Sequence, residues 1–99
     1  MTKVGAGGVI IRSFRTTKRF NKDIKRLDRK IAEKALRKIG ALTGDPIPPG
    51  LVFEKLRGKD RPPIYTIHVN GNFKVSMTIE GNEAILRRIG VHDLIDDNP

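Results

Sequence analysis

The sequence predicts an α+β fold in which an N-terminal strand and a two-helix hairpin pack on a small, mainly antiparallel β-sheet. Two patterns predict this architecture. Between residues 20 and 42 the apolar residues recur every three or four positions, which is typical of amphipathic helices. From residue 65 onward apolar and polar residues alternate, as in strands with one buried face, and two turns rich in Gly and Asn interrupt the alternation. Helices followed by adjacent strands indicate an α+β domain.

The length and composition fit one small domain. The chain has 99 residues, 37% of them hydrophobic, with no Trp and no Cys, which excludes a disulfide framework and a thiolate metal site. Its apolar runs are far shorter than the roughly 20 residues that span a bilayer, so we expect a cytoplasmic protein with no membrane partner. Residues 1–8 are Gly-rich and predict a flexible arm, and residues 9–99 are expected to form the single domain.

The positive charge is concentrated in the first half of the chain. The formal net charge is +9, and residues 12–38 hold twelve Lys and Arg against three Asp and Glu, whereas the remainder holds eight of each sign. Such a field attracts phosphate backbones, and it also attracts acidic proteins. The alternative is a solvated helix surface that keeps a small protein soluble.

The N-terminal half predicts one strand and two helices. Residues 9–14 are rich in β-formers and predict the strand. Thr16 or Thr17 follows as a helix N-cap, and Asp28 is expected to cap a second helix that ends at Gly44. The apolar stripe consists of Phe20, Ile24, Leu27, Ile31, Ala35, Ile39 and Leu42. The pattern favours a helical hairpin packed on one sheet face, and one unbroken helix over the same residues is the alternative.

The second half predicts strands. Residues 51–56 are a weaker strand candidate, and residues 57–63 (RGKDRPP) predict a basic loop because their prolines disfavour regular structure. Beyond this loop the two faces separate clearly. The apolar face contains Tyr65, Ile67, Val69, Phe73, Val75, Met77 and Ile79, so Tyr65 is expected to pack rather than to react. The polar face contains Thr66, His68, Lys74, Ser76, Thr78 and Glu80.

The register of the first hairpin follows from matching these faces. A two-residue Asn70-Gly71 turn would place Ile67 opposite Lys74 and mix the faces. A three-residue turn over residues 70–72 places His68 opposite Lys74 and keeps the apolar side chains together, so we predict the longer turn. Asn72 is expected to adopt the left-handed conformation in it.

The second hairpin turns at Gly81-Asn82 and admits two registers. A three-residue loop places Lys74 opposite Gly90, with His92 one diagonal step away. A two-residue turn would bring Ala84 and Leu86 inward and send His92 to the other face. We favour the three-residue loop, in which His68, Lys74 and His92 line one shallow groove and Gly90 leaves space for a ligand.

This groove has the groups that RNA cleavage needs. The 2′-hydroxyl of RNA is the nucleophile, and two imidazoles can serve as base and acid near neutral pH. Lys74 and Arg57 are expected to stabilise the charged transition state. No metal or other cofactor is expected. The alternatives are a structural role for His68, a helix-cap role for His92, and a solvated position for Lys74.

Five stretches resemble the RelE/ParE toxin superfamily: FNKDIKRL, KLRG at residues 55–58, Tyr-x-Ile at 65–67, Asn-Phe-Lys-Val at 72–75 and Ile-Gly-Val-His-Asp at 89–93. The resemblance covers residues 11–95 in order. It implies the RelE-like fold, with two helices against an antiparallel-rich sheet. It also implies the toxin of a toxin–antitoxin pair, an endoribonuclease that cuts mRNA at the ribosome and inhibits translation. A cognate antitoxin would neutralise it in a hetero-oligomer.

The resemblance also implies roles for individual residues. Lys74 would contact the scissile phosphate, and His68 and His92 would act as acid and base in either order. The residues expected to bind RNA or phosphate are Arg57, Lys55, Lys59, Arg61 and Arg88. Thr66 stands where some members have lysine, and the tail IDDNP lacks an aromatic residue for base stacking. The alternative is the ParE-like branch, which has the same fold but inhibits DNA gyrase and is not a nuclease.

Overall fold

The computed structural model describes residues 9–99, and the arm predicted for residues 1–8 lies outside the described residues. The sheet has five strands in the order β1-β5-β4-β3-β2, with β1 parallel to β5 and the other neighbours antiparallel. The elements are β1 (Ser13–Thr16), α2 (Lys18–Arg26), α3 (Arg29–Gly40), η1 (Ala41–Thr43), η2 (Pro49–Leu51), β2 (Glu54–Asp60), β3 (Pro63–His68), β4 (Phe73–Glu80), β5 (Glu83–Val91) and α4 (His92–Asp97). The predicted α+β fold class is confirmed.

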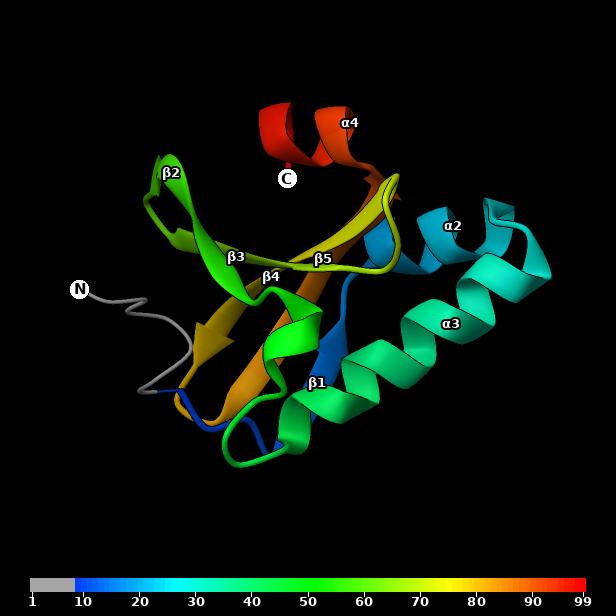
Figure 1. The fold of residues 1–99 in the computed structure, drawn as a ribbon. Helices are drawn as coiled ribbons and strands as arrows, with labels where there is room; N and C mark the ends of the chain where they lie inside the picture. The colour runs from blue at the N-terminus through cyan, green and yellow to red at the C-terminus, as the bar shows by residue number, and fades with distance from the viewer. Residues whose placement is uncertain (1–8) are drawn as a thin grey trace.

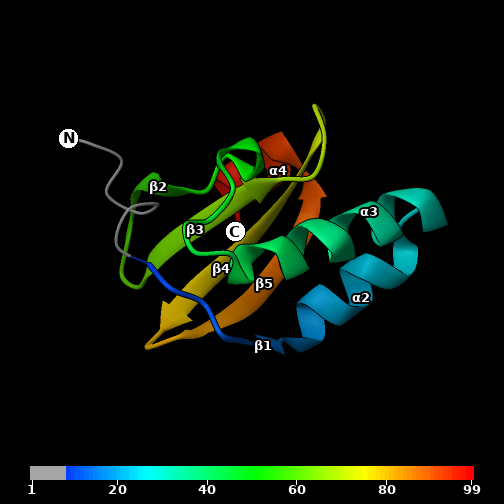
Figure 2. The same ribbon diagram turned by 60° about the horizontal axis from the view of Figure 1, so that its bottom comes forward.

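The sheet lies between two layers of unequal size. Figures 1 and 2 show α2 and α3 on one side of the sheet and the short α4 on the other. The hydrophobic core lies between the helical hairpin and the sheet. Its buried members include Ile11, Phe20, Ala35, Ile39, Leu42, Ile67, Val69, Val75, Met77, Ala84, Leu86 and Ile89. No helix in residues 9–99 is long and apolar enough to cross a membrane.

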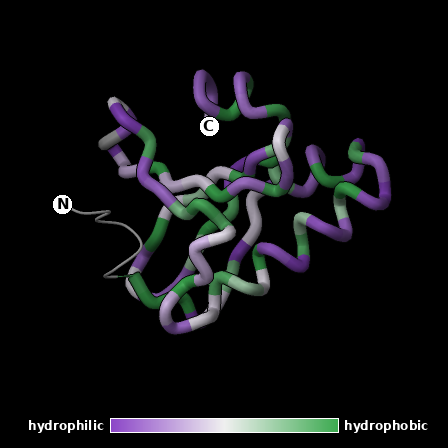
Figure 3. Tube along the Cα trace, viewed as in Figure 1, coloured by the Kyte–Doolittle hydropathy of each residue, from purple (hydrophilic) through white to green (hydrophobic). Residues whose placement is uncertain are grey.

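The helical hairpin is confirmed, and the single long helix is wrong. Thr17 caps α2, since its Oγ1 accepts a hydrogen bond from the Phe20 N–H at 3.1 Å. Asp28 caps α3 through a hydrogen bond from the Lys30 N–H, also at 3.1 Å. Each cap satisfies a backbone donor that a helix start leaves unpaired. Helix α3 ends at Gly40, and Gly44 ends the following η1 turn instead. Hydrophilic and hydrophobic residues alternate along both helices (Figure 3).

The predicted register of the first hairpin is confirmed. Ile67 pairs with Val75, and His68 pairs with Lys74. The expected left-handed conformation of Asn72 is wrong, because Val52 is the one non-glycine residue with positive φ in residues 9–99. The turn is closed by the side chain of Asn70, whose Oδ1 accepts hydrogen bonds from the backbone N–H groups of residues 72 and 73 at 2.8 and 2.9 Å. This side chain removes the need for positive φ.

The second hairpin combines both registers that the sequence allows. It has a two-residue turn, with Glu80 opposite Glu83, so the predicted three-residue loop is wrong at the turn. A β-bulge then shifts the register between Ser76 and Met77, and beyond it Lys74 pairs with Gly90 as predicted. The bulge places an extra residue on β5 and thereby restores the face on which Ile89 is buried. Ala84 and Leu86 are buried as well, before the bulge.

Two strands differ from the predictions in their bounds, and one helix was not predicted. Strand β1 covers Ser13–Thr16, later than residues 9–14, because its parallel pairing with β5 sets its position. Strand β2 covers Glu54–Asp60, so residues 51–53 lie outside it and most of the predicted basic loop is strand. The loop prolines lie at the turn and at the first position of β3, where a missing N–H is tolerated. Helix α4 was not predicted, since six residues give too short a pattern.

Candidate functional site

The sheet face beneath α4 is polar and buried. Thr66 and Ser76 are fully buried, and Lys74 and Thr78 are each 8% exposed. Alternation along β3 and β4 brings these side chains to the face opposite the hydrophobic core. Helix α4 and the residues that follow it cover this face (Figure 1). The candidate site is therefore a polar surface under a short cover.

Lys74 lies at the centre of this face. It pairs with His68 on one side and with Gly90 on the other. Its side chain is 10% exposed, and its Nζ lies 2.8 Å from Oδ1 of Asp96 in α4. A buried ammonium needs an oxygen partner, and here the partner is a carboxylate that is itself 40% exposed. A phosphate oxygen has the charge and acceptor character to take the same position.

The two histidines lie at the same end of the sheet as Lys74. His68 is half-buried at the end of β3. His92 starts α4, and its backbone N–H donates to the carbonyl of Asn72 at 2.8 Å. Its side chain is 48% exposed, and Nδ1 lies 2.9 Å from Oδ1 of Asp93. Within residues 9–99 no hydrogen bond or ion pair joins the His68, Lys74 and His92 side chains to one another.

The expected space over Gly90 is absent. A Cβ at this glycine would lie 3.4 Å from Cδ2 of Leu94 and 3.7 Å from Cδ1 of Ile95. Helix α4 therefore occupies the volume that was expected to admit a ligand. The physical reason is that a strand without a side chain at this position lets the helix turn back and approach β5 closely.

Four of the five residues predicted to bind RNA or phosphate lie on the edge strand β2 or in the turn that follows it. Lys55 and Arg57 are exposed on β2. Arg61 is exposed in the β2–β3 turn, and half-buried Lys59 donates from Nζ to the carbonyl of Asp97 at 3.3 Å. Arg61 and Lys59 line a pocket of about 460 Å³ that also includes Arg19 and Arg87. The basic side chains thus form a second region beside the Lys74 face.

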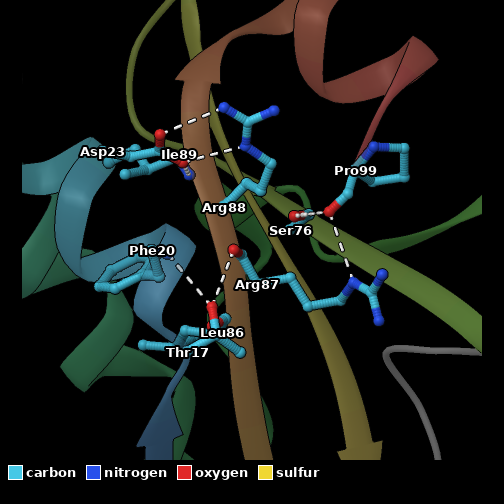
Figure 4. A network of polar contacts seen from close by, with 9 residues as sticks. All are labelled: Thr17, Phe20, Asp23, Ser76, Leu86, Arg87, Arg88, Ile89 and Pro99. Carbon is cyan, nitrogen blue, oxygen red and sulfur yellow. Dashed lines mark hydrogen bonds and ion pairs between the residues drawn. The ribbon is translucent and has the colours of Figure 1, made fainter.

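Arg88 is held by Asp23 of α2. The pair is bidentate, with Nε–Oδ2 at 3.1 Å and Nη2–Oδ1 at 3.2 Å, and the Ile89 N–H donates to the same carboxylate at 3.2 Å (Figure 4). Both side chains are at least 85% buried, with exposures of 15% and 12%. The hydrogen bond to Asp23 raises the pKa of Arg88 above its usual value, against a smaller lowering by burial. This pair joins α2 to β5, so the Arg88 guanidinium already has an anionic partner.

Several polar groups of this face were not singled out from the sequence. They are Arg87, Ser76 and Asp96, together with the carbonyl of Pro99. A signal existed for Arg87, because the buried apolar residues of β5, Ala84, Leu86 and Ile89, are spaced by two and then three positions, and the step of three marks the bulge. The described residues contain no group of three or more His, Asp or Glu that would hold a metal ion.

No protein-family model and no curated protein matches the sequence. Solved structures do match the fold. A chain of the Escherichia coli DinJ-YafQ toxin–antitoxin complex matches with a TM-score of 0.69 at 18% identity, over 87% of this chain and 98% of that one. YafQ alone from E. coli strain BL21(DE3) gives 0.64 at 17% identity over 85% and 97%. A chain of the RelB-RelE antitoxin–toxin complex from Methanococcus jannaschii gives 0.65 at 24% identity over 86% and 99%. The chain therefore has the fold of the RelE-like toxins.

Proposed function

We propose that this chain is the toxin of a toxin–antitoxin pair, a metal-independent endoribonuclease that cleaves mRNA at the ribosome and inhibits translation in the cytoplasm. One observation carries the proposal. The ammonium of Lys74 is buried at the centre of a polar sheet face, with one histidine directly opposite and a second at the same end of the sheet. The fold shared with YafQ and RelE supports it.

The chemistry follows from the groups on this face. A histidine takes the proton of the substrate 2′-hydroxyl, and the 2′-oxygen forms a bond to phosphorus. The bond from phosphorus to the 5′-oxygen breaks, and the other histidine gives that oxygen a proton. Lys74 stabilises the negative charge that develops on the phosphoryl oxygens. His68 and His92 are interchangeable in the two proton-transfer roles, and Arg57 adds positive charge from β2.

Two features support a role for the ribosome. Within residues 9–99 no hydrogen bond or ion pair joins the histidine side chains to Lys74, and the tail IDDNP contains no aromatic residue to stack on a base. A substrate that is held in position by the ribosome brings its reacting groups together without these contacts, and such positioning accounts for a large part of a catalysed rate. The ribosome-bound message is therefore the proposed substrate.

The proposed protein partner is a cognate antitoxin. DinJ-YafQ and RelB-RelE are complexes of this kind. Helices α2 and α3 lie on the side of the sheet opposite α4 and carry exposed basic residues, among them Lys22, Lys25, Arg29 and Arg37. An acidic partner would be steered to this surface. The association rate should then fall as ionic strength rises, and a rate that stays constant would contradict an electrostatic contribution.

The test is translation in a cell-free bacterial extract, with the 5′ ends of the message mapped by primer extension. We expect new ends inside codons, and we expect Lys74→Ala and His92→Ala each to reduce their formation by about 10²-fold or more. Lys22→Ala removes an exposed lysine of α2 and is the matched control, which should retain cleavage. Intact message with normal translation would contradict the proposal, and inhibition of gyrase supercoiling by the same protein would support the ParE-like alternative.

A further inference from the structure

A second group of donors lies two residues beyond Lys74 on β4. The Ser76 hydroxyl donates to the carbonyl oxygen of Pro99 at 3.0 Å, and the Arg87 Nε–H donates to the same oxygen at 3.4 Å. Figure 4 shows both side chains directed at this one oxygen. Ser76 is fully buried. Two donors from neighbouring strands therefore converge on a single acceptor.

Thr66 adds an unpartnered hydroxyl to this group. It lies directly opposite Ser76 across the β3–β4 pair. Its Oγ1 is buried, and no atom of the described residues accepts or donates a hydrogen bond to it. Buried polar groups without partners are rare in folded proteins and call for an explanation. A ligand oxygen bound beside Ser76 would supply the missing partner.

The charge around this group is positive. The adjacent pocket of about 460 Å³ is lined by Arg19 of α2, Lys59 of β2, Arg61 of the β2–β3 turn and Arg87 of β5. One carboxylate, that of Asp97, also lines it, and the Lys59 ammonium is bonded to the backbone carbonyl of the same residue. Cations from four separate elements thus surround the site, as in a site for a multiply charged anion.

We propose that Ser76, Arg87 and Thr66 form an anion-binding subsite for a phosphodiester of the RNA strand that neighbours the scissile one. The inference rests on the proposed function, since Lys74 holds the scissile phosphate. Lys74 and Ser76 point to the same face and lie about 7 Å apart along the strand, which matches the spacing of successive phosphates in an RNA chain. In this structure Asp96 and Pro99 supply the acceptor oxygens at the two positions. RNA binding replaces both.

The test measures binding of a single-stranded RNA oligonucleotide with 2′-O-methyl groups at every ribose, which the protein cannot cleave. Fluorescence anisotropy gives the affinity at several salt concentrations. Arg87→Gln is expected to weaken binding several-fold and to reduce the salt slope by about 0.7, which corresponds to one phosphate contact on a single strand. Ser76→Ala should weaken binding without changing the slope. Arg87→Lys, which keeps the charge, should restore the slope.

Arg15→Gln is the matched control, because Arg15 is a 56% exposed arginine of β1 that loses the same charge. Circular dichroism and thermal unfolding of each variant establish that it is folded. If Arg87→Gln binds like the wild type while Lys74→Ala binds weakly, the subsite is wrong and the proposed function stands. If Arg15→Gln has the same effect as Arg87→Gln, binding depends on net charge alone and the subsite is again wrong. A wild-type protein that fails to bind the oligonucleotide at low salt overturns the subsite and the RNA-binding face together.

Discussion

The two faces of the sheet are both buried, but by different means. On the face toward α2 and α3, Ile67, Val75 and Met77 are fully buried among the side chains of two helices. On the face toward α4, Thr66 and Ser76 are equally buried, yet the cover consists of six helical residues and the end of the chain. The first face is stabilised by apolar area. The second is held by the ion pair between Lys74 and Asp96, by the hydrogen bonds to Pro99 and by the buried Ile95.

The cover itself has one apolar anchor. Ile95 is fully buried, whereas Leu94 is 40% exposed. A helix of this length is not stable alone in water, so α4 is held by Ile95, by the Lys74–Asp96 pair and by the hydrogen bonds to Pro99 and Asp97. A site whose cover is held this weakly is suited to exchange the cover for a ligand.

The largest expected effect comes from the helix-covered face. Phe20 is 2% exposed in the core, and Phe20→Ala is expected to lower the free energy of unfolding by about 3–5 kcal/mol, because it removes buried area and leaves a cavity. Chemical denaturation with urea measures this loss. Lys22→Ala on the same helix should change stability by less than about 0.5 kcal/mol. A loss below about 1 kcal/mol for Phe20→Ala would contradict the packing described for this face.

On the α4-covered face we expect a substitution with a smaller effect on stability, which lowers the free energy of unfolding but raises RNA affinity. Asp96→Asn weakens the ion pair with Lys74 and should lower the free energy of unfolding by about 1 kcal/mol. RNA affinity should rise several-fold, since the competing carboxylate is gone. Asp45→Asn is the matched control, because it makes the same charge change on an exposed side chain between η1 and η2, outside the lining of the basic pocket. Equal gains in RNA affinity for the two variants would show that net charge, and not release of Lys74, is responsible.

The parts of the fold that were predictable are those set by local chemistry. The caps at Thr17 and Asp28 follow from side chains that bond the first free N–H groups of a helix. The β3–β4 register follows from alternation, because any one-residue slip would expose the apolar face. The positions of His68 and Lys74 in the candidate site depend on this register alone, and for that reason sequence reasoning brought them together.

The parts that were not predictable depend on contacts distant in sequence. The bulge near Arg87 changes the face of every later residue in β5, and face matching at the turn and at the far end favours different registers. Helix α4 has no usable period of its own, and its position over Gly90 depends on Leu94 and Ile95 reaching back to β5. The burial of Lys74 and the role of Asp96 follow from that helix, and so they were missed.

The smallest expected effect comes from Thr66 on the polar face, where one substitution should raise stability and lower RNA affinity. Thr66→Val replaces the unpartnered hydroxyl with a methyl group of similar volume. Because an unsatisfied buried hydroxyl is costly, the variant should gain up to about 1 kcal/mol in the free energy of unfolding. RNA affinity should fall at the same time, since the proposed subsite uses this hydroxyl to bind a phosphate oxygen. The corresponding change on the other face, Val75→Thr, should only destabilise. If Thr66→Val lowers stability, the hydroxyl has a partner in the folded protein, and the polar face is then held by its own hydrogen bonds.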